Sequence, residues 1–381
     1  MLNNSKIKVI GAGPSSSILA IALSRLSNKI DLFDPLSLEE LINIDRTYAI
    51  TQSSRKVFHS IGLWNEVEKL SCSFDSLVVH DKSIDRSITF DINDLTKDNC
   101  ESSSIGWIIE HRLLMKIIMR QIVENPNILF YQQSTSILDS DKYDFTFASD
   151  GKFSQSRNYL KIPSFSFRYN QACLTFKILA RFTTPKTAYE VFRKDGPLAI
   201  LPVRNDLYQV IWSAPKDVCL DRISMTRSFF LDQLAVAMPF DIQPDCLIDQ
   251  PKLCDIDFLF SFRFHVLSKT LFGESIHSLH PVGGQGLNLS IRDVKELYEL
   301  FNKLSPREKL DLPAIFESNR RLDIFITSIL TDSLVRIFSS KNSILLLFRR
   351  LLFALLLSNK LFRRFILLLM TDGISGFKAN I

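Results

Sequence analysis

The residues from Gly273 to Asp293 have types and a spacing that suit the binding of an anionic group. Pro281 opens a short loop that holds three glycines, Gly283, Gly284 and Gly286. Glycine reaches positive φ and lets a flat ligand approach the main chain without a Cβ in the way. From Asn288 to Leu300 apolar residues recur at helical spacing, so the loop leads into a helix N-terminus that favours a phosphate or an oxyanion. The alternative is a plain glycine-rich turn that caps a helix.

A second anion-binding pattern lies near the N-terminus. A short apolar strand ends in Gly11 and Gly13, a helical pattern follows, and the next strand ends in Asp34. This order is the dinucleotide-binding fingerprint, which NAD-binding and FAD-binding proteins share. The two glycines allow the tight turn and the approach of a pyrophosphate, and Ser16 takes the place of the third glycine. Asp34 is expected to accept hydrogen bonds from ribose hydroxyls.

Together the two patterns resemble the flavin-binding motifs of the aromatic-ring hydroxylases of the p-hydroxybenzoate hydroxylase type. The closest resemblance is to the prenylphenol hydroxylases of ubiquinone biosynthesis, which carry Gly-Asp-Ala-Ala-His and then Pro-x-x-Gly-Gln-Gly-Leu-Asn-Leu-Gly-x-Arg-Asp. The matching residues here are His277, Pro281, Gly284, Gln285, Gly286, Leu287, Asn288, Leu289, Arg292 and Asp293. The resemblance implies that FAD contacts the loop residues Pro281, Gly283, Gly284, Gly286, Leu287 and Asn288.

Further matches extend the resemblance along the chain from residue 5 to residue 340. Arg46 is a candidate for the pyrophosphate or the flavin edge, and its alternative is an ordinary surface ion pair. Arg112 matches a polar or basic side chain that contacts the flavin in the family. Asp150 and Gly151 match a motif whose acid supports the flavin and contacts the pyridine nucleotide, although Asp-Gly is also a common turn.

Four residues depart from the family pattern. Glu274 stands where the family has an aspartate that holds the ribityl chain of FAD, so the charge is kept with one more methylene. Ser275 and Ile276 replace two alanines and add bulk beside the flavin. Together with Ser16, these changes are expected to lower turnover more than they alter the fold.

The element pattern predicts an α/β fold with four parts. Residues 1–160 and 268–340 form a Rossmann-like FAD-binding domain in two pieces. Residues 161–267 carry short strand-like runs with one helical run, which indicates an inserted mixed β-sheet domain for the substrate. Residues 341–381 form a helical, basic and apolar tail.

The net charge of +5 is concentrated in this tail. From Lys341 onward seven basic residues stand against the single acid Asp372, so the tail carries +6 and the rest of the chain −1. This distribution argues against nucleic acid as a partner, since a binding face would spread its basic residues. No uncharged apolar run reaches the length of a membrane span. We expect two short helices that lie on the membrane surface, or equally that pack against the body of the protein.

The six cysteines show no metal or redox spacing, which predicts reduced thiols in a cytoplasmic protein, with peripheral membrane binding through the tail. No His cluster, nucleophile elbow or P-loop is present, so no metal is expected and no catalytic residue is assigned. The chemistry must then come from a cofactor.

The resemblance implies FAD, reduction by NAD(P)H as a transient co-substrate, and O2. It implies hydroxylation of a hydrophobic aromatic substrate, a prenylated phenol or quinone precursor. Two alternatives remain: a flavin-dependent isoprenoid reductase or epoxidase, and a degenerate flavin-fold protein that binds without catalysis.

Overall fold

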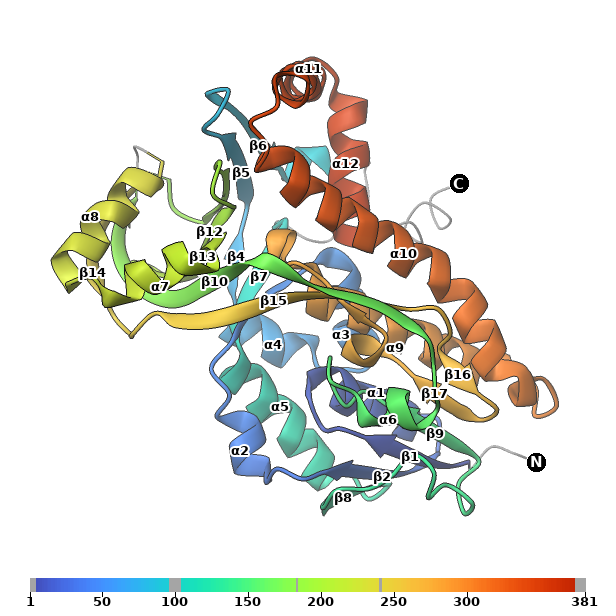
Figure 1. Cartoon of the computed structure of the whole chain (residues 1–381). Coiled ribbons are helices and arrows are strands. Elements are labelled where there is room, and N and C mark those ends of the chain that lie inside the picture. Colours follow the sequence, from blue (N-terminus) through green and yellow to red (C-terminus); the bar gives the residue numbers. More distant parts are fainter. Residues whose placement is uncertain (1–4, 96–103, 183, 240–241, 374–381) are drawn as a thin grey trace.

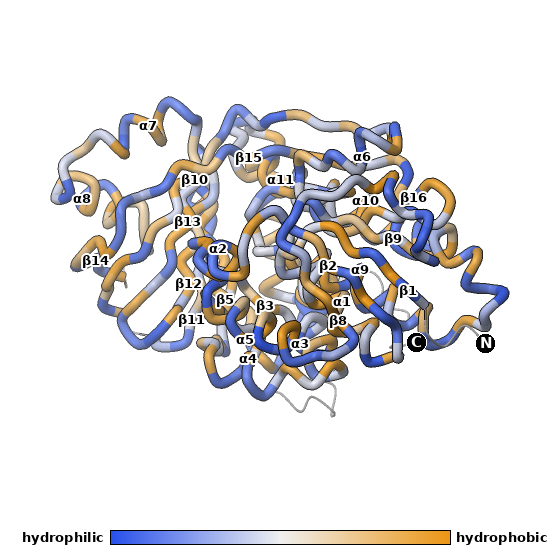
Figure 2. The backbone as a smooth tube through the Cα atoms, turned by 90° about the horizontal axis from the view of Figure 1, so that it is seen from below, coloured by the Kyte–Doolittle hydropathy of each residue, from blue (hydrophilic) through white to orange (hydrophobic). Residues whose placement is uncertain are grey.

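A six-stranded sheet with a parallel core forms the N-terminal layer of the computed structural model, which describes residues 5–95, 104–182, 184–239 and 242–373 (Figure 1). Its strand order is β16 (His265–Val266), β17 (Lys269–Leu271), β9, β1, β2 and β8 (Ile128–Gln132). The central strand β1 (Lys6–Ile10) pairs in parallel with β2 (Lys29–Asp34) and β9 (Phe145–Ala148). Strands β1 and β2 are buried over most of their length, as expected of parallel strands covered on both faces, and Figure 2 shows hydrophobic backbone segments near α1.

Three helices pack on this sheet: α1 (Pro14–Ser24), α5 (His111–Glu124) and α9 (Gln285–Lys303). Helix α1 contacts both α5 and α9. All residues of α1 from Ser15 to Ser24 are buried, so this helix lies inside the domain rather than on its surface. Helix α9 comes from the far end of the chain, and its contact with α1 brings the two predicted anion-binding patterns into one domain.

A nine-stranded sheet forms the second layer, with the order β18-β15-β10-β13-β12-β11-β5-β6, in which β18 is His277–Ser278. Strand β14 (Ile242–Leu247) pairs with β10. Strand β10 (Ser164–Phe182) is antiparallel to β13 (Leu207–Pro215) and β15 (Lys252–Ser261), and Figure 1 shows β10 and β15 running across the middle of the molecule. Helices α7 (Lys216–Ser224) and α8 (Arg227–Ala237) pack on this layer.

Two strands of this second sheet come from the N-terminal part of the chain. Strand β5 (Ser76–Asp81) pairs in parallel with β11 (Thr187–Phe192), and β6 (Arg86–Asp91) is antiparallel to β5. A small sheet of β3 (Thr47–Ile50), β7 (Gly106–Glu110) and β4 (Cys72–Phe74) contacts β12 (Leu198–Arg204) through β4 and β7, and α9 through β3. It therefore connects the two larger layers.

The C-terminal helices pack on the body of the protein. They are α10 (Leu312–Phe338), α11 (Ser343–Ser358) and α12 (Lys360–Asp372), and Figure 1 shows α11 and α12 beside β5 and β6. Arg349 is fully buried and pairs with Asp81 at 3.2 Å, and Arg363 pairs with Asp94 at 2.6 Å. Two basic residues of the tail thus serve internal contacts.

Within the described ranges, no helix combines the length and the apolar character needed to cross a bilayer. Five cysteines are described and carry free thiols, whereas Cys100 and the basic residue Lys378 lie outside the described residues.

Candidate active site

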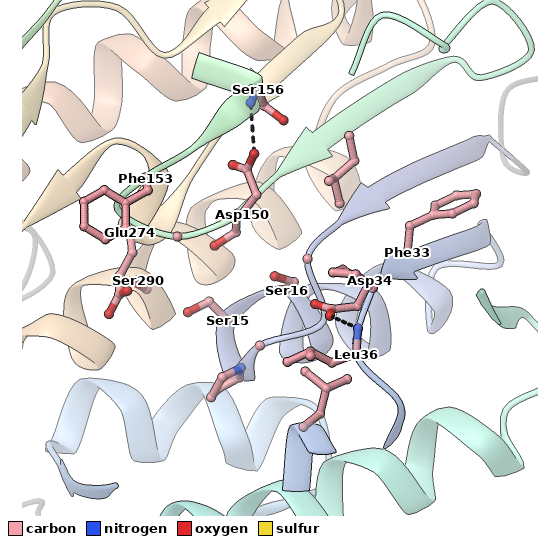
Figure 3. A pocket seen from close by; sticks show the side chains of 18 of the residues that line it. Ser15, Ser16, Phe33, Asp34, Leu36, Asp150, Phe153, Ser156, Glu274 and Ser290 are labelled. Carbon is pink, nitrogen blue, oxygen red and sulfur yellow. Dashed lines mark hydrogen bonds between the residues drawn. The ribbon is translucent and has the colours of Figure 1, made fainter. Parts of the chain in front are cut away.

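A cavity of about 480 Å³ opens at the carboxyl ends of β1, β2 and β9 (Figure 3). Ligands of doubly wound sheets bind at this edge. Figure 3 shows Asp34 and Glu274 on opposite sides of the cavity, with Ser15 and Ser16 between them. The predicted residues that line it are Gly11, Gly13, Ser16, Asp34, Arg46, Asp150, Gly151, Glu274 and Leu287.

The turn between β1 and α1 is held in place by Asp34. One carboxylate oxygen accepts from the Ala12 amide at 2.7 Å, and the other accepts from the Leu36 amide at 2.9 Å. Gly11 has φ +89°, and a Cβ there would lie 2.6 Å from the Ser149 carbonyl oxygen, so this position requires glycine.

The N-terminus of α1 faces the same cavity with free donors. Its N-cap is Gly13, which has no side chain to accept from the first N–H groups, and a Cβ on Gly13 would meet no atom within 4 Å. The Oγ of Ser16 is buried without a hydrogen-bond partner among the described residues. Unpaired donors at a helix N-terminus fit the oxygens of a pyrophosphate.

Asp150 supports the loop on the other side of the cavity. Its carboxylate accepts from the Ser154 hydroxyl and from the Ser156 amide, at 2.5 and 2.9 Å. Arg157 donates to the Ser275 carbonyl at 2.8 Å. The Asp-Gly and Ser-x-x-Arg segment therefore links β9 to the stretch that begins at Gly273.

Arg46 and Glu274 approach each other at the cavity, with 4.0 Å between Nη1 and Oε1 and about half of each side chain exposed. Tyr48 lies on the same face of β3 as Arg46, and its hydroxyl is 2.9 Å from Nδ1 of His111. Nε2 of His111 is 2.7 Å from the Leu41 carbonyl and must donate to it, so Nδ1 accepts from Tyr48. Burial lowers the pKa of His111, which keeps the imidazole neutral at neutral pH.

A second cavity of about 230 Å³ lies on the other face of β3. Thr47 and Ala49 line it, whereas the alternate residues Arg46 and Tyr48 line the first cavity. Of the predicted flavin-loop residues, three reach this second cavity, namely Pro281, Gly283 and Gly284.

The walls of the second cavity are mainly aliphatic and aromatic, from the second sheet and helices α10, α11 and α12. Glu190 on β11 is the exception.

The glycine loop has the backbone that its sequence predicts. Gly283 and Gly284 have φ of +68° and +60°, and a Cβ on Gly284 would lie 3.1 Å from that of Ala49. Gly286 lines neither cavity, although a Cβ there would meet nothing within 4 Å. The side-chain amide Nε2 of Gln285 donates to the Met370 carbonyl at 2.8 Å, which anchors α12 to the loop.

The side chain of Asn288, predicted to contact the cofactor, is instead engaged within the protein. Its Nδ2 donates to the carbonyls of Ala49 and Gly284 at 2.7 and 2.8 Å. Its Oδ1 accepts from the Ser54 hydroxyl at 2.7 Å and from the Thr51 amide at 3.0 Å. Asn288 is 1% exposed, so its amide positions the loop.

Three predicted site residues, Arg112, Gly286 and Asn288, line neither described cavity. The side chain of Arg112 is exposed on α5, and the preceding residue His111 lines the first cavity. Successive residues of a helix point about 100° apart, so Arg112 and His111 lie on different faces of α5, and the flavin contact of Arg112 stays a prediction.

Other residues of the matched motif form a buried charged network beneath the loop. Asp293 accepts from His277 Nε2 at 3.1 Å, from the Gly273 amide at 3.0 Å and from Arg320 Nε at 2.8 Å. Arg292 pairs with Asp323 at 3.2 Å. These contacts fix α9 against α10 and the start of the loop.

The polar cavity residues that sequence reasoning did not select include Tyr48, His111 and Glu190. His111 directly precedes the residue that was chosen. Glu190 carried no local signal, because all six residues of the strand Thr187–Phe192 are buried; within the strand it lies on the same face as Ala188 and Phe192.

No protein-family model matches the chain. The chain is 24% identical over 360 residues to the uncharacterised protein slr1300 of Synechocystis, covering 89% of this chain and 86% of that protein. It is 22% identical over 416 residues to the ubiquinone biosynthesis monooxygenase COQ6 of Mus musculus, covering 90% and 86%. The solved structure of PqsL, a probable FAD-dependent monooxygenase from Pseudomonas aeruginosa, matches with a TM-score of 0.72 at 15% identity, covering 88% and 97%. These similarities confirm the predicted resemblance and fold class: the chain is a homologue of the ubiquinone-biosynthesis monooxygenases and has the fold of the FAD-dependent monooxygenases.

Proposed function

We propose that this protein is an FAD-dependent monooxygenase that hydroxylates the aromatic ring of a prenylated phenol or quinone precursor, with NAD(P)H and O2 as co-substrates. The observation that carries the proposal is the pair of cavities on the two faces of β3. The first is the more polar of the two and is lined by the dinucleotide fingerprint, and the second is apolar and bounded by the glycine loop.

The first cavity fits the adenosine and pyrophosphate parts of FAD. The α1 N-terminus and the Ser16 hydroxyl offer unpaired donors, and the open space at Gly13 leaves room for phosphate oxygens. Asp34 would accept from the ribose, and Glu274 would accept from the ribityl chain. Leu287 and the start of α9 extend the cavity wall toward the glycine loop.

When bound, FAD supplies the redox chemistry, taking a hydride from NAD(P)H and activating O2. The protein's part is to hold and enclose it. The N-terminus of α9 favours negative charge beside the glycine loop. The apolar walls of the second cavity exclude water from the reacting centre.

The second cavity fits a hydrophobic aromatic ring with an aliphatic substituent. Its wall includes Phe74, Phe90, Phe192 and Phe338 together with several leucines. Strands β5, β6, β11, β12 and β13 provide one side of it, so we propose that residues 76–91 belong with residues 161–267 to the substrate domain. Residues 1–75, 92–160 and 268–340 would form the FAD-binding domain.

The C-terminal helices would deliver such a substrate from a membrane surface. Their inner residues line the second cavity, whereas an exposed apolar stripe runs along the outer side of α11 at helical spacing: Ile344, Leu347, Phe348, Leu351 and Leu355. Exposed basic residues flank it, at Lys341, Arg350 and Lys360. A basic helix with an exposed apolar face suits the interface of an anionic bilayer.

The absorbance spectrum of the purified protein tests the assignment. We expect bound FAD, its bleaching by NADPH without air, and recovery with O2. With a prenylated phenol present, mass spectrometry should detect a product heavier by one oxygen from labelled O2. A colourless protein that takes up no FAD contradicts the proposal. Reduction or epoxidation of the isoprenoid chain would favour the alternative flavin reaction.

A further inference from the structure

Glu190 is placed where the fold otherwise requires an apolar residue. On β11, Ala188, Glu190 and Phe192 face the second cavity, while Tyr189 and Val191 belong to the core beneath α7 and α8. Its cross-strand neighbours Val79 and Ala199 also line the cavity and are apolar. A carboxyl group on this face has no packing role that an apolar side chain would not fill better.

The contacts of Glu190 leave one oxygen unsatisfied. The residue is 9% exposed, Oε2 accepts from the Gly283 amide at 3.4 Å, and Oε1 has no partner among the described residues. Two other buried carboxylates are paired with arginines, Asp81 with Arg349 and Asp293 with Arg320. A buried polar atom without a partner is costly, and in a ligand cavity it marks a site for a ligand group.

The groups that face Glu190 are uncharged. The described lining residues of the cavity from β3, β5, β6, β12, β13 and the C-terminal helices carry no formal charge. The other titratable lining residue is Tyr189, whose hydroxyl lies 2.8 Å from the Thr184 hydroxyl, in the core on the opposite face of β11. The unpaired Oε1 can therefore accept a hydrogen bond from a donor on a bound molecule.

We propose that Glu190 is the base that accepts the phenolic proton of the substrate before the ring is hydroxylated. This inference rests on the function proposed above. In the step, the phenol O–H bond breaks, its electron pair stays on oxygen as phenolate, and the proton forms a new O–H bond with Oε1 of Glu190. No oxidation accompanies it. The phenolate is a more electron-rich ring, which favours attack on an electrophilic oxygen.

The surroundings give this carboxyl a suitable basicity. Burial raises the pKa of Glu190 to about 7, opposed by the hydrogen bond from the Gly283 amide. A base with a pKa near the working pH combines a useful ionised fraction with the strength to take a proton. Because the Gly283 amide belongs to the glycine loop, the same contact holds the carboxyl beside the place proposed for the flavin.

The first test measures binding, without turnover. FAD-loaded full-length protein is titrated at pH 8.5 with a 4-alkylphenol and with its methyl ether, which cannot donate. We expect the wild type to prefer the phenol at least tenfold, and Glu190→Leu to lose this preference while binding the ether at least as well. An unchanged preference in Glu190→Leu overturns the proposal.

The second test measures the pH profile of product formation. The wild type should gain activity with rising pH and level off above about pH 7. Glu190→Gln should lower hydroxylation by roughly 10² to 10⁴ fold and lose this inflection, while NADPH-dependent flavin reduction persists. A ring-fluorinated phenol, which ionises more easily, should narrow the gap between Glu190→Gln and the wild type.

Glu124→Gln is the matched control, because Glu124 is exposed at the end of α5. If Glu190→Gln hydroxylates at the wild-type rate and keeps the pH inflection, Glu190 is not the base, while the proposed function still stands. A wild type that binds no FAD contradicts the proposed function, and the role of Glu190 falls with it.

Discussion

The side-chain amide of Asn288 donates to the backbone carbonyl of Ala49, with 2.7 Å between Nδ2 and O. This bond ties the first turn of α9 to β3, the strand whose two faces line the two cavities. The same amide group also donates to the Gly284 carbonyl. One side chain thus holds the glycine loop beside the strand that separates the two cavities.

Replacing Asn288 should therefore damage both the fold and cofactor binding. Asn288→Ala leaves the Ala49 carbonyl, the Thr51 amide and the Ser54 hydroxyl without their buried partner, which should cost about 3 kcal/mol of unfolding free energy. Thermal unfolding with and without FAD measures it. Asn302→Ala makes the same chemical change at an exposed position of α9 and should have little effect. Equal stability of the two variants would show that the loop does not depend on this amide.

Two glycines of the β1–α1 turn should respond in opposite ways to the same substitution. Gly11→Ala places a Cβ 2.6 Å from the Ser149 carbonyl at a φ of +89°, and should destabilise the protein by roughly 3 kcal/mol. Gly13→Ala meets no protein atom and should change stability by less than about 1 kcal/mol.

The methyl group that Gly13→Ala introduces would, however, enter the space proposed for the pyrophosphate. We expect Gly13→Ala to weaken FAD binding at least tenfold, measured by fluorescence titration of the FAD-free protein. Normal FAD affinity in a stable Gly13→Ala variant would contradict the placement of the pyrophosphate at this turn.

The local motifs were predictable from sequence because their chemistry lies in short segments. Glycines at Gly11 and Gly283 predict positive φ, and an acid at the end of the second strand, Asp34, predicts a hydrogen-bond acceptor at the turn. Motif matching does not place individual side chains. The Asn288 side chain makes its hydrogen bonds within the protein, and His111 lines the cavity next to the predicted Arg112, so the cofactor contacts of both predicted residues stay predictions.

What the sequence did not reveal depends on contacts between distant segments. The parallel pairing of β5 with β11 joins residues more than a hundred positions apart, and no local pattern encodes that partner. The position of α12 on the glycine loop is of the same kind, because one hydrogen bond from Gln285 to Met370 spans 85 positions. Glu190 became a candidate only when these pairings formed an apolar cavity around it.

Glu274 offers a way to separate cofactor binding from stability. Its ion pair with Arg46 spans 4.0 Å between half-exposed side chains, and such pairs contribute at most about 1 kcal/mol. Glu274→Ala should therefore leave the melting temperature of the FAD-free protein nearly unchanged. It should raise the dissociation constant for FAD about tenfold, through the loss of one acceptor. Glu124→Ala controls for the lost charge, and a Glu274→Ala variant with unaltered FAD affinity would remove this residue from the site.

The buried carboxyl of Glu190 predicts a pH-dependent stability. Its pKa is about 7 in the folded protein against 4.5 for the free side chain, so between these values the folded state holds a proton that the unfolded state has released. Stability should then fall as pH rises from 4.5 to 7 and stay constant above. Relative to Glu190→Gln, the wild type should lose up to about 3 kcal/mol over this range. Urea unfolding at several pH values tests this, and a difference between the two proteins that does not vary with pH would contradict a buried, unpaired Glu190.

The exposed stripe on α11 predicts binding to anionic membranes. Leu347 and Leu351 are 58% and 62% exposed, one turn apart, and Arg350 lies beside them. We expect co-sedimentation with phosphatidylglycerol vesicles, weaker with phosphatidylcholine alone and reduced by salt, since each basic residue near such a surface contributes about 1 kcal/mol. Arg350→Gln should lower the partition coefficient about fivefold, and the double change Leu347→Ser with Leu351→Ser should lower it further. Leu129→Ser removes an equally exposed leucine from β8 and should bind as the wild type does. If all of these proteins sediment alike, or if none sediments with either lipid, the C-terminal helices are not the membrane contact.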